Sequence, residues 1–299
     1  MTKELKNFTL TSIKNIQKAI ENNKLVIFVG AGVSRNSGIP TWPELIKELA
    51  KDLGIRAKGK DSEGNDVFGN DEFLKIPQYY YNERNEKEYY DKIKEVLDKD
   101  SQPNEIHKII FELNPTHIIT TNYDNLLEKQ ARQIQTNIKY CKAANDIELS
   151  TAPNCNFIIK MHGEFDNIVL KESDYDAYSN NFKLTETYVK GLFATHTILF
   201  VGFSAEDSNI RRILQWIKDI IGDKHQPAYL IDVNDHSDIS EEEFRIKFEY
   251  YKNQGIFTLY KSQIEDEIKT TFNNFRGELN LKDLGLDLYK FLFFIKNNL

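Results

Sequence analysis

Residues 25–34 of this 299-residue chain read Leu-Val-Ile-Phe-Val-Gly-Ala-Gly-Val-Ser. The apolar run from Leu25 to Val29 is typical of a strand that is buried on both faces of a parallel sheet. Two glycines end this run, and the segment behind them leads towards a helix. Glycines at such a turn let the backbone approach a ligand closely, and N–H groups at a helix start favour phosphate. The stretch therefore predicts either a phosphate loop or a tight turn without a ligand.

The glycine spacing departs from two common phosphate-binding patterns. A dinucleotide-binding loop would carry a third glycine at position 35, where this chain has Arg35, and a P-loop would continue with Gly-Lys-Ser or Gly-Lys-Thr. The glycines alone therefore do not decide between a ligand site and a plain turn. The candidate phosphate contacts are Gly30, Ala31, Gly32 and Ser34.

Further apolar runs alternate with stretches of helical periodicity along the chain. This alternation predicts the α/β class, with a Rossmann-like doubly wound parallel sheet. We expect a single domain with a core over about 11–262, an inserted helical subdomain over about 54–113 and a helical extension over about 263–299. The expected strands after the first are residues 116–121, 157–161, 197–201, 228–232 and 256–260.

Polar side chains with useful chemistry stand just after four successive predicted strands. In an open parallel sheet, ligands bind beyond the carboxyl ends of the strands, so these residues should meet in one place. Ordinary turns would explain each of them singly, but four coincidences favour a ligand site. The residues are Ser34, Asn122 with Asp124, His162, and Ser204.

Composition excludes several classes of protein. The chain has 46 Asp and Glu against 39 Lys and Arg, a formal charge of −7, which argues against a broad nucleic-acid backbone binder. Its two cysteines, Cys141 and Cys155, can neither staple a secreted scaffold nor complete a four-cysteine zinc site. We find no signal peptide and no apolar run near the roughly 20 residues of a membrane helix. We expect a cytoplasmic protein without a membrane or direct nucleic-acid partner.

Several motifs, in the same order along the chain, resemble those of the Sir2 (sirtuin) superfamily. They extend from residue 24 to about residue 235, and it is their combination that makes the resemblance specific. The matching segments are Gly30-Ala31-Gly32-Val33-Ser34 continued by Ser37-Gly38-Ile39-Pro40, then Thr121-Asn122-Tyr123-Asp124, His162-Gly163, Gly202-Phe203-Ser204 and Ile231-Asp232.

The chain also departs from the typical deacetylases of that superfamily. Thr41-Trp42-Pro43 stands where they carry Asp-Phe-Arg, and no cysteine follows His162 to build their zinc module. We therefore expect no zinc module and no bound metal. The pattern is more similar to bacterial Sir2-like domains of anti-phage defence systems, whose known members hydrolyse NAD+. The resemblance implies an NAD+ glycohydrolase that depletes NAD+ during abortive infection.

The resemblance also implies roles for individual residues. Asn122 would hydrogen-bond the ribose hydroxyls or the attacking water, and His162 would accept a proton near neutral pH. Asp124 would lie near the nicotinamide and Trp42 would wall its pocket. The remaining assignments are pyrophosphate for Gly30, Ala31, Gly32 and Ser34, phosphate or ribose for Gly202 and Ser204, and the adenosine ribose for Asp232.

Alternatives remain open at this point. Asn122 would also fit the cap of a helix starting at Tyr123, Asp124 a first-turn helix acid, and Ser34 a cap. The whole chain would also fit a zinc-free NAD-dependent protein deacylase or a non-catalytic NAD or ADP-ribose sensor. Because a constantly active NAD+ hydrolase would kill its host, we expect control by homo-oligomerisation, or by a sensor domain or partner that responds to phage. The chain equally fits the front part of a longer protein.

Overall fold

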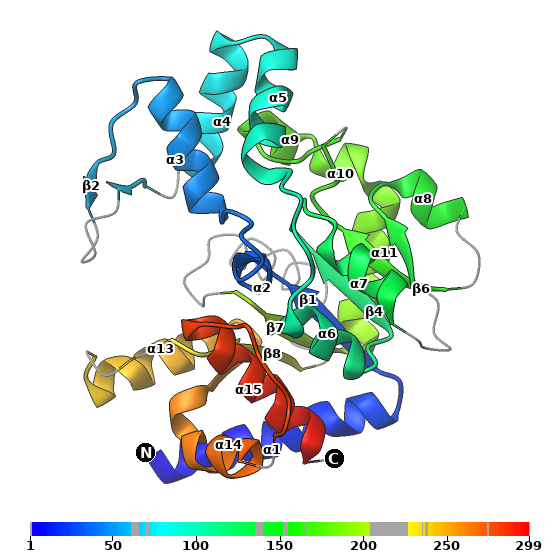
Figure 1. The fold of residues 1–299 in the computed structure, drawn as a ribbon, viewed down its shortest axis with the longest axis vertical. Coiled ribbons are helices and arrows are strands. Elements are labelled where there is room, and N and C mark those ends of the chain that lie inside the picture. Colours follow the sequence, from blue (N-terminus) through cyan, green and yellow to red (C-terminus); the bar gives the residue numbers. More distant parts are fainter. Residues whose placement is uncertain are drawn as a thin grey trace.

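A seven-stranded, entirely parallel sheet forms the centre of the computed structural model (Figure 1), with the strand order β5-β6-β4-β1-β7-β8-β9. The structure describes residues 2–60, 66–69, 72–134, 140–151, 155–165, 167–203, 227–234, 236, 239–273 and 275–298. The strands are β1 (Leu25–Val29), β4 (His117–Thr120), β5 (Tyr140–Ala143), β6 (Asn156–Lys160), β7 (Thr197–Val201), β8 (Ala228–Asp232) and β9 (Ile256–Tyr260).

The predicted α/β class with a Rossmann-like parallel sheet is confirmed, and each of the six predicted strands is present. The sequence analysis missed β5, the strand at one edge of the sheet. Only Ala143 of its four residues is buried, so it lacks the apolar run by which the buried strands were found.

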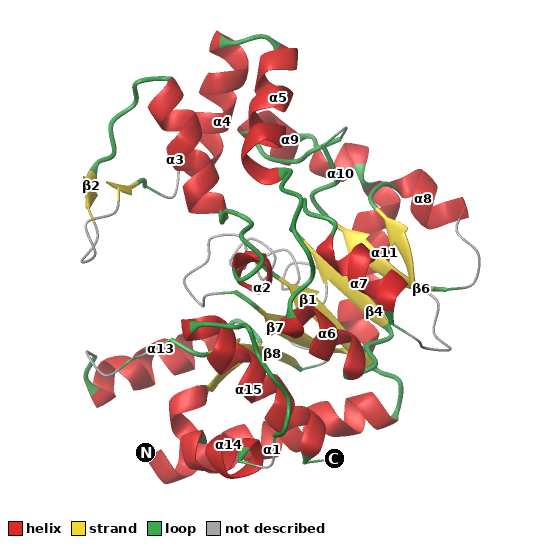
Figure 2. Cartoon of the chain, in the orientation of Figure 1, coloured by secondary structure: helices red, strands yellow, loops and turns green. Residues whose placement is uncertain are grey.

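Helices cover both faces of the sheet (Figure 2), which explains why its central strands are continuously apolar. Leu25 and Ile27 of β1 pack into one apolar core, whereas Val26 and Phe28 pack into the other. The first core receives side chains from α1 (Thr2–Glu21), α6 (Glu105–Glu112), α7 (Leu126–Gln133), α14 (Glu265–Phe272) and α15 (Asp283–Asn297). The second receives side chains from α8 (Asp146–Thr151), α11 (Lys183–Thr195) and α13 (Glu241–Asn253).

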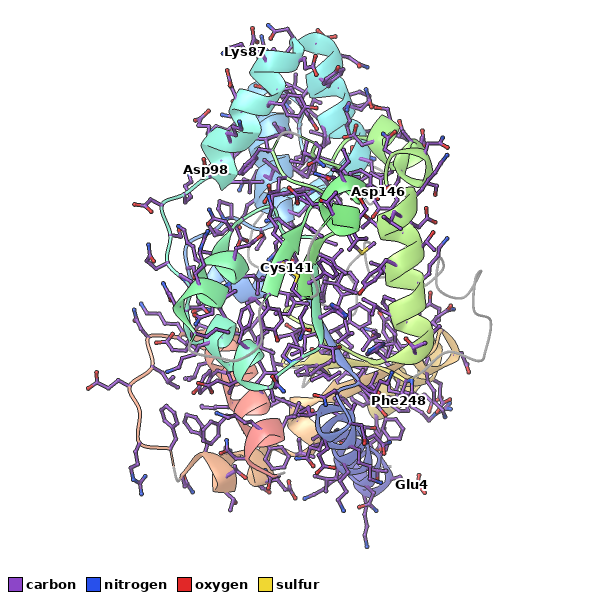
Figure 3. All side chains as sticks on the ribbon, turned by 90° about the vertical axis from the view of Figure 1, so that its right-hand side faces the viewer. Glu4, Lys87, Asp98, Cys141, Asp146 and Phe248 are labelled. Atoms are coloured by element: carbon purple, nitrogen blue, oxygen red, sulfur yellow. A yellow bond between two sulfur atoms is a disulfide. The ribbon has the colours of Figure 1, made fainter. Side chains whose placement is uncertain are left out.

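A third apolar core lies in a separate group of helices, at the opposite end of the molecule from both termini (Figure 1). It contains buried side chains of α3 (Trp42–Asp52), α4 (Glu72–Glu83) and α5 (Glu86–Leu97). Figure 3 shows this separation from the side, with Lys87 of α5 at one end and Glu4 of α1 at the other. Of the predicted insertion over 54–113, α4 and α5 belong to this group, whereas α6 packs against α15.

The C-terminal apolar cluster is part of the core. Phe291, Leu292, Phe294 and Ile295 of α15 are buried, and this helix packs on α6 and α14. No helix among the described residues is both long and apolar enough to cross a membrane.

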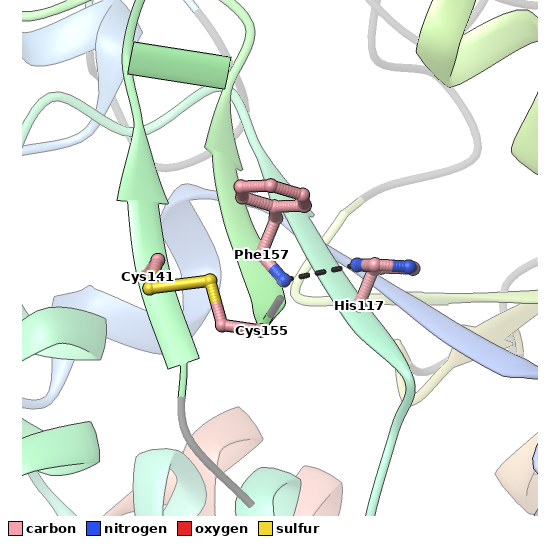
Figure 4. Close-up of a disulfide and its surroundings, with 4 residues drawn as sticks. All are labelled: His117, Cys141, Cys155 and Phe157. Atoms are coloured by element: carbon pink, nitrogen blue, oxygen red, sulfur yellow. Dashed lines mark hydrogen bonds between the residues drawn. A yellow bond between two sulfur atoms is a disulfide. The ribbon is translucent and has the colours of Figure 1, made fainter. Parts of the chain in front are cut away.

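The two cysteines form a disulfide, which corrects the expectation that set disulfide stapling aside (Figure 4). Cys141 lies on β5 and Cys155 directly precedes β6, with their Cα atoms 6.1 Å apart. Because the two strands are parallel neighbours, Cys141 pairs with Phe157 and comes close to a residue that lies 14 positions along the chain. Neither cysteine carries a free thiol in this structure.

Candidate active site

The chain segments that follow β1 and β7 are packed backbone to backbone. The amide of Gly30 donates to the carbonyl of Val201 (2.9 Å), and the amide of Gly32 donates to the carbonyl of Gly202 (3.0 Å). A Cβ atom on Gly32 would lie 2.7 Å from the carbonyl oxygen of Gly202, which itself has a positive φ of 76°. The glycines are therefore required for this close approach. Contact of Gly30, Gly32 and Gly202 with phosphate remains a prediction.

The Asn122 side chain joins the segment after β4 to the segment after β1. Its amide nitrogen Nδ2 donates to the carbonyl of Gly30 (3.2 Å) and to the hydroxyl of Ser34 (3.3 Å). Both Asn122 and Ser34 are buried, and Ser34 belongs to the short helix α2 (Ala31–Arg35). Because α7 begins only at Leu126, Asn122 does not cap a helix at Tyr123, and that alternative is wrong.

Asp124 lines the same pocket as Asn122, and its side chain also forms a hydrogen bond with the nearby backbone. Its Oδ1 accepts a hydrogen bond from the amide of Leu126 (3.0 Å), the first residue of α7. The carboxylate thus stabilises the helix start, as an acid in that position commonly does. This bond uses one carboxylate oxygen, so it is compatible with a second role in a ligand site.

Aromatic rings surround His162, which follows β6 and is 6% exposed. The imidazole lies edge-to-face against Tyr175 (5.4 Å between ring centroids) and against Trp42 (6.3 Å). The rings of Trp42 and Tyr175 are nearly parallel, with 8° between their planes and 6.5 Å between their centroids. Gly163 follows with a positive φ of 69°, so the chain turns sharply directly behind the histidine.

These groups line one pocket at the carboxyl ends of the strands. About 600 Å³ of empty space, including open solvent, lies within it. Six predicted residues line it: Ala31, Ser34, Trp42, Asn122, Asp124 and His162. The sequence analysis did not assign the rest of the lining, which is Ile39, Pro40, Leu45, Leu97, Thr121, Tyr123 and Phe203.

Comparison with known proteins matches a segment of this chain to a family model. Residues 116–257 match the family model of the SIR2-like domain. The chain contains a SIR2-like domain. It is 35% identical over 259 residues to "Defense-associated sirtuin 2" of Bacillus subtilis, covering 84% of this chain and 24% of that protein.

Two further relatives are named "NAD(+) hydrolase ThsA". The protein from Enterococcus faecium is 32% identical over 229 residues, which are 73% of this chain and 45% of the relative. The protein from Cytobacillus dafuensis is 28% identical over 245 residues, which are 80% of this chain and 48% of the relative. The chain thus spans from about a quarter to about a half of the length of the three relatives.

Asp232 of the SIR2-like domain lies outside the pocket lining, at the end of β8. The side chain is 2% exposed, and its Oδ1 accepts from the backbone amide (2.9 Å) and the side-chain amide (2.8 Å) of Asn234. Its Oδ2 contacts Nε2 of His236 at 3.1 Å. The carboxylate therefore organises the turn after β8, and its contact with a ribose remains a prediction. Ser204 lies outside the described residues.

A histidine outside the pocket lining, His107, has structural surroundings. His107 is fully buried at the start of α6, where its Nδ1 accepts from the amide of Asn104 (3.2 Å). Burial lowers the pKa of His107 to about 4, so its imidazole is neutral at physiological pH. His225 lies outside the described residues.

No cluster of three or more His, Cys, Asp or Glu side chains in the described part of the chain is placed to hold a metal ion. The side chains of the pocket itself supply several kinds of polar group. An amide, a carboxylate, a hydroxyl and an imidazole stand among aromatic and aliphatic walls. Such a site can hold a flat ring and hydrogen-bond a sugar beside it.

Proposed function

We propose that this chain hydrolyses NAD+ to ADP-ribose and nicotinamide, and that it serves as an NAD+-depleting effector in anti-phage defence. The observation that carries the proposal is the convergence of Asn122 and His162 on one aromatic-walled pocket at the carboxyl ends of the strands. The names of the relatives, NAD+ hydrolase and defence-associated sirtuin, support the same reaction.

The reaction breaks the bond between C1′ of the ribose and the nicotinamide nitrogen. Water adds to C1′, and a proton is released with ADP-ribose. Because the nicotinamide ring is already cationic, it leaves as a neutral molecule without needing a proton. The enzyme must stabilise the positive charge that develops on the ribose and must position the water.

Asn122 and His162 suit these two tasks. The amide of Asn122 is held by the Gly30 carbonyl and the Ser34 hydroxyl, so it presents a fixed polar group to the ribose hydroxyls. In our proposal, the imidazole of His162 accepts the proton from a ribose hydroxyl or from water. Asp124 faces the cationic nicotinamide, which also favours the aromatic surface of Trp42.

The rest of NAD+ would extend along the ends of β1, β7 and β8. We propose that the backbone of Gly30, Ala31, Gly32 and Gly202, with Ser34 and Ser204, contacts the pyrophosphate and the nearer ribose. In the same proposal, Asp232 accepts a hydrogen bond from the adenosine ribose. Its carboxylate oxygens retain lone pairs after the bonds to Asn234 and His236.

Incubation of the purified protein with NAD+, alone and with an acyl-lysine peptide, tests the reaction. We expect equal amounts of nicotinamide and ADP-ribose without peptide. Turnover that requires the peptide would instead support a zinc-free deacylase. NAD+ binding without turnover, at every protein concentration tried, would support a sensor. Chromatography of both products separates these outcomes.

We further propose that a homo-oligomer in the cytoplasm, controlled by a sensor segment or partner that responds to phage, is the active form. The matched relatives extend well beyond the segment that this chain spans, which leaves room in them for other parts. Measurement of NAD+ turnover and of molecular mass by light scattering, over the same range of protein concentrations, tests the link. Full activity of a monomer would contradict it.

A further inference from the structure

A lysine is fully buried against the loop that follows Asn122. Lys160 is the last residue of β6 and has no exposed surface. A lysine is rarely buried to this extent unless its ammonium group is paired, because removal of the charge from water is costly. The contacts of this ammonium group therefore indicate what it does.

The ammonium of Lys160 bonds to the chain segment that carries Asn122. Its Nζ donates to the carbonyl of Tyr123 (3.2 Å) and to the carbonyl of Asp124 (2.5 Å). It also forms ion pairs with Glu128 (3.2 Å) and Glu164 (3.7 Å). An ammonium has three N–H donors, and these four oxygens surround them. The two carboxylates balance the buried charge.

These contacts join three parts of the site. Lys160 pairs with Thr120 in the sheet and stands two residues before His162. The two carbonyls belong to the loop between β4 and α7, and Glu128 lies in the first turn of α7. A single ammonium thus ties the strand that leads to His162 to the loop of Asn122 and to the helix behind it.

A second tie runs through Tyr123, the neighbour of Asn122. Its hydroxyl donates to the carbonyl of Val169 (2.7 Å), and the amide of Val169 donates to the carbonyl of His162 (2.9 Å). The backbone of Tyr123 is held by Lys160, and its side chain is held by a residue that is bonded to His162. The loop is therefore fixed to the histidine from two directions.

We propose that Lys160 is a positioning residue, which fixes Asn122 and Asp124 relative to His162 by binding the carbonyls of their loop. This inference rests on the proposed function in so far as it concerns turnover. It concerns geometry rather than contact with substrate, because Lys160 does not line the pocket in the described part of the chain. Lys160 should therefore affect kcat much more than KM.

The test uses a double variant, because Lys160→Met alone leaves the carboxylates of Glu128 (12% exposed) and Glu164 (31% exposed) with less compensation and should destabilise the fold. Adding Glu128→Gln removes one of these charges, while Glu164 keeps its ion pair with Lys142 (2.6 Å). We expect this folded double variant to lose about 100-fold in kcat with KM changed less than about 3-fold. Lys160→Arg, which keeps the cation, should recover part of the loss.

Lys142→Met is the matched control. Lys142 pairs with the same Glu164, but its side chain is 34% exposed, and its ion pairs in the described part of the chain are with Glu148 and Glu164. We expect its kcat to stay within about 3-fold of the unmodified chain. If the cations around Glu164 acted only through their charge, kcat would fall equally in the double variant and in Lys142→Met. That result would overturn the inference.

Amide hydrogen exchange provides a readout that does not depend on activity. Without the ammonium, the amides of residues 121–125 should exchange about tenfold faster, whereas those of the central strands should not change. Unchanged exchange in the folded double variant, or wild-type kcat in it, would overturn the inference. If the unmodified chain does not hydrolyse NAD+, the proposed function fails, but the exchange experiment still decides whether Lys160 holds the loop.

Discussion

The two ends of the sheet each place a histidine among aromatic rings, yet they differ in what surrounds it. At the carboxyl ends of the strands, His162 lies against Trp42 and Tyr175. At the amino ends, His117 opens β4 and lies against Phe157 and Tyr188. Only the first histidine lines a pocket that also receives Asn122.

The ring nitrogens of His117 are both occupied by the protein. Nδ1 accepts from the amide of Phe157 (2.9 Å; Figure 4), and Nε2 lies 3.3 Å from the hydroxyl of Tyr188. Burial, together with the nearby His196, lowers the pKa of His117 to about 4. A histidine at a strand end is therefore structural when both of its ring nitrogens are occupied by groups of the protein itself, and a site requires polar groups gathered from several strands.

Substitution of the pocket residues gives the largest expected contrast. We predict that Asn122→Ala or His162→Ala lowers nicotinamide release about 10³-fold or more, because each removes a group that acts on the ribose or the water. His117→Asn, which retains a hydrogen-bond acceptor for Phe157, should stay within about 3-fold of the unmodified chain. Product chromatography gives the rates, and circular dichroism checks the fold. Equal losses in all three variants would remove the distinction between the two ends.

Much of this contrast was predictable from sequence, because buried parallel strands are apolar on both faces and their ends are marked by polar residues. The runs that end at Val29 and Thr121 located two strand ends, and Asn122, Asp124 and His162 were recognised as a set. Their convergence follows from the parallel arrangement, in which all carboxyl ends meet at one edge.

The parts that sequence did not predict depend on tertiary contacts. Tyr175 reaches His162 from a segment without any motif, and Lys160 looks like a surface residue until its partners are known. The disulfide was missed because Cys141 lies on β5, a strand that has no apolar signal. Chain spacing alone does not bring such residues together.

The disulfide lies at the amino end of the sheet, and its reduction gives the second test of the difference between the two ends. Closure of the loop between Cys141 and Cys155, 14 residues apart, should stabilise the fold by up to about 3 kcal/mol, mainly by restricting the unfolded chain. We predict that reductant lowers the free energy of unfolding by this order in urea titrations, while nicotinamide release by the folded protein is unchanged.

A Cys141→Ala/Cys155→Ala variant is the control for this measurement. Its stability should be insensitive to reductant and close to that of the reduced protein. A large loss of turnover on reduction would show that the amino end of the sheet communicates with the pocket, and it would contradict the proposed independence of the two ends.

The smallest expected effect is the loss of stability at acid pH that His117 causes. The pKa of His117 in the folded chain is about 4, below its ordinary value of about 6.5, so the unfolded chain takes up a proton first as the pH falls. The stability that this histidine contributes is present above about pH 6.5 and is lost between there and pH 4. At pH 5 the loss should be about 1 to 2 kcal/mol, allowing for partial exposure.

Urea titrations of the unmodified chain and of His117→Asn, at pH 5 and pH 8, measure this effect. The free energy of unfolding should change less between pH 8 and pH 5 in the variant, by about 1 to 2 kcal/mol, since asparagine does not titrate. An identical pH dependence in both proteins would show that His117 carries no such linkage. His107, whose pKa burial also lowers to about 4, should add a similar acid sensitivity to both.

The contact between Gly32 and Gly202 has a consequence for how the protein is made. The pocket takes its described lining from residue 31 to residue 203, and α2 is bonded through Gly32 to the end of β7. A nascent chain that has not yet added β7 to the sheet has neither that bond nor the wall that Phe203 supplies. Under the proposed function, an unfinished chain on the ribosome cannot consume NAD+. In that case, the strand order delays the consumption of NAD+ until translation has passed β7.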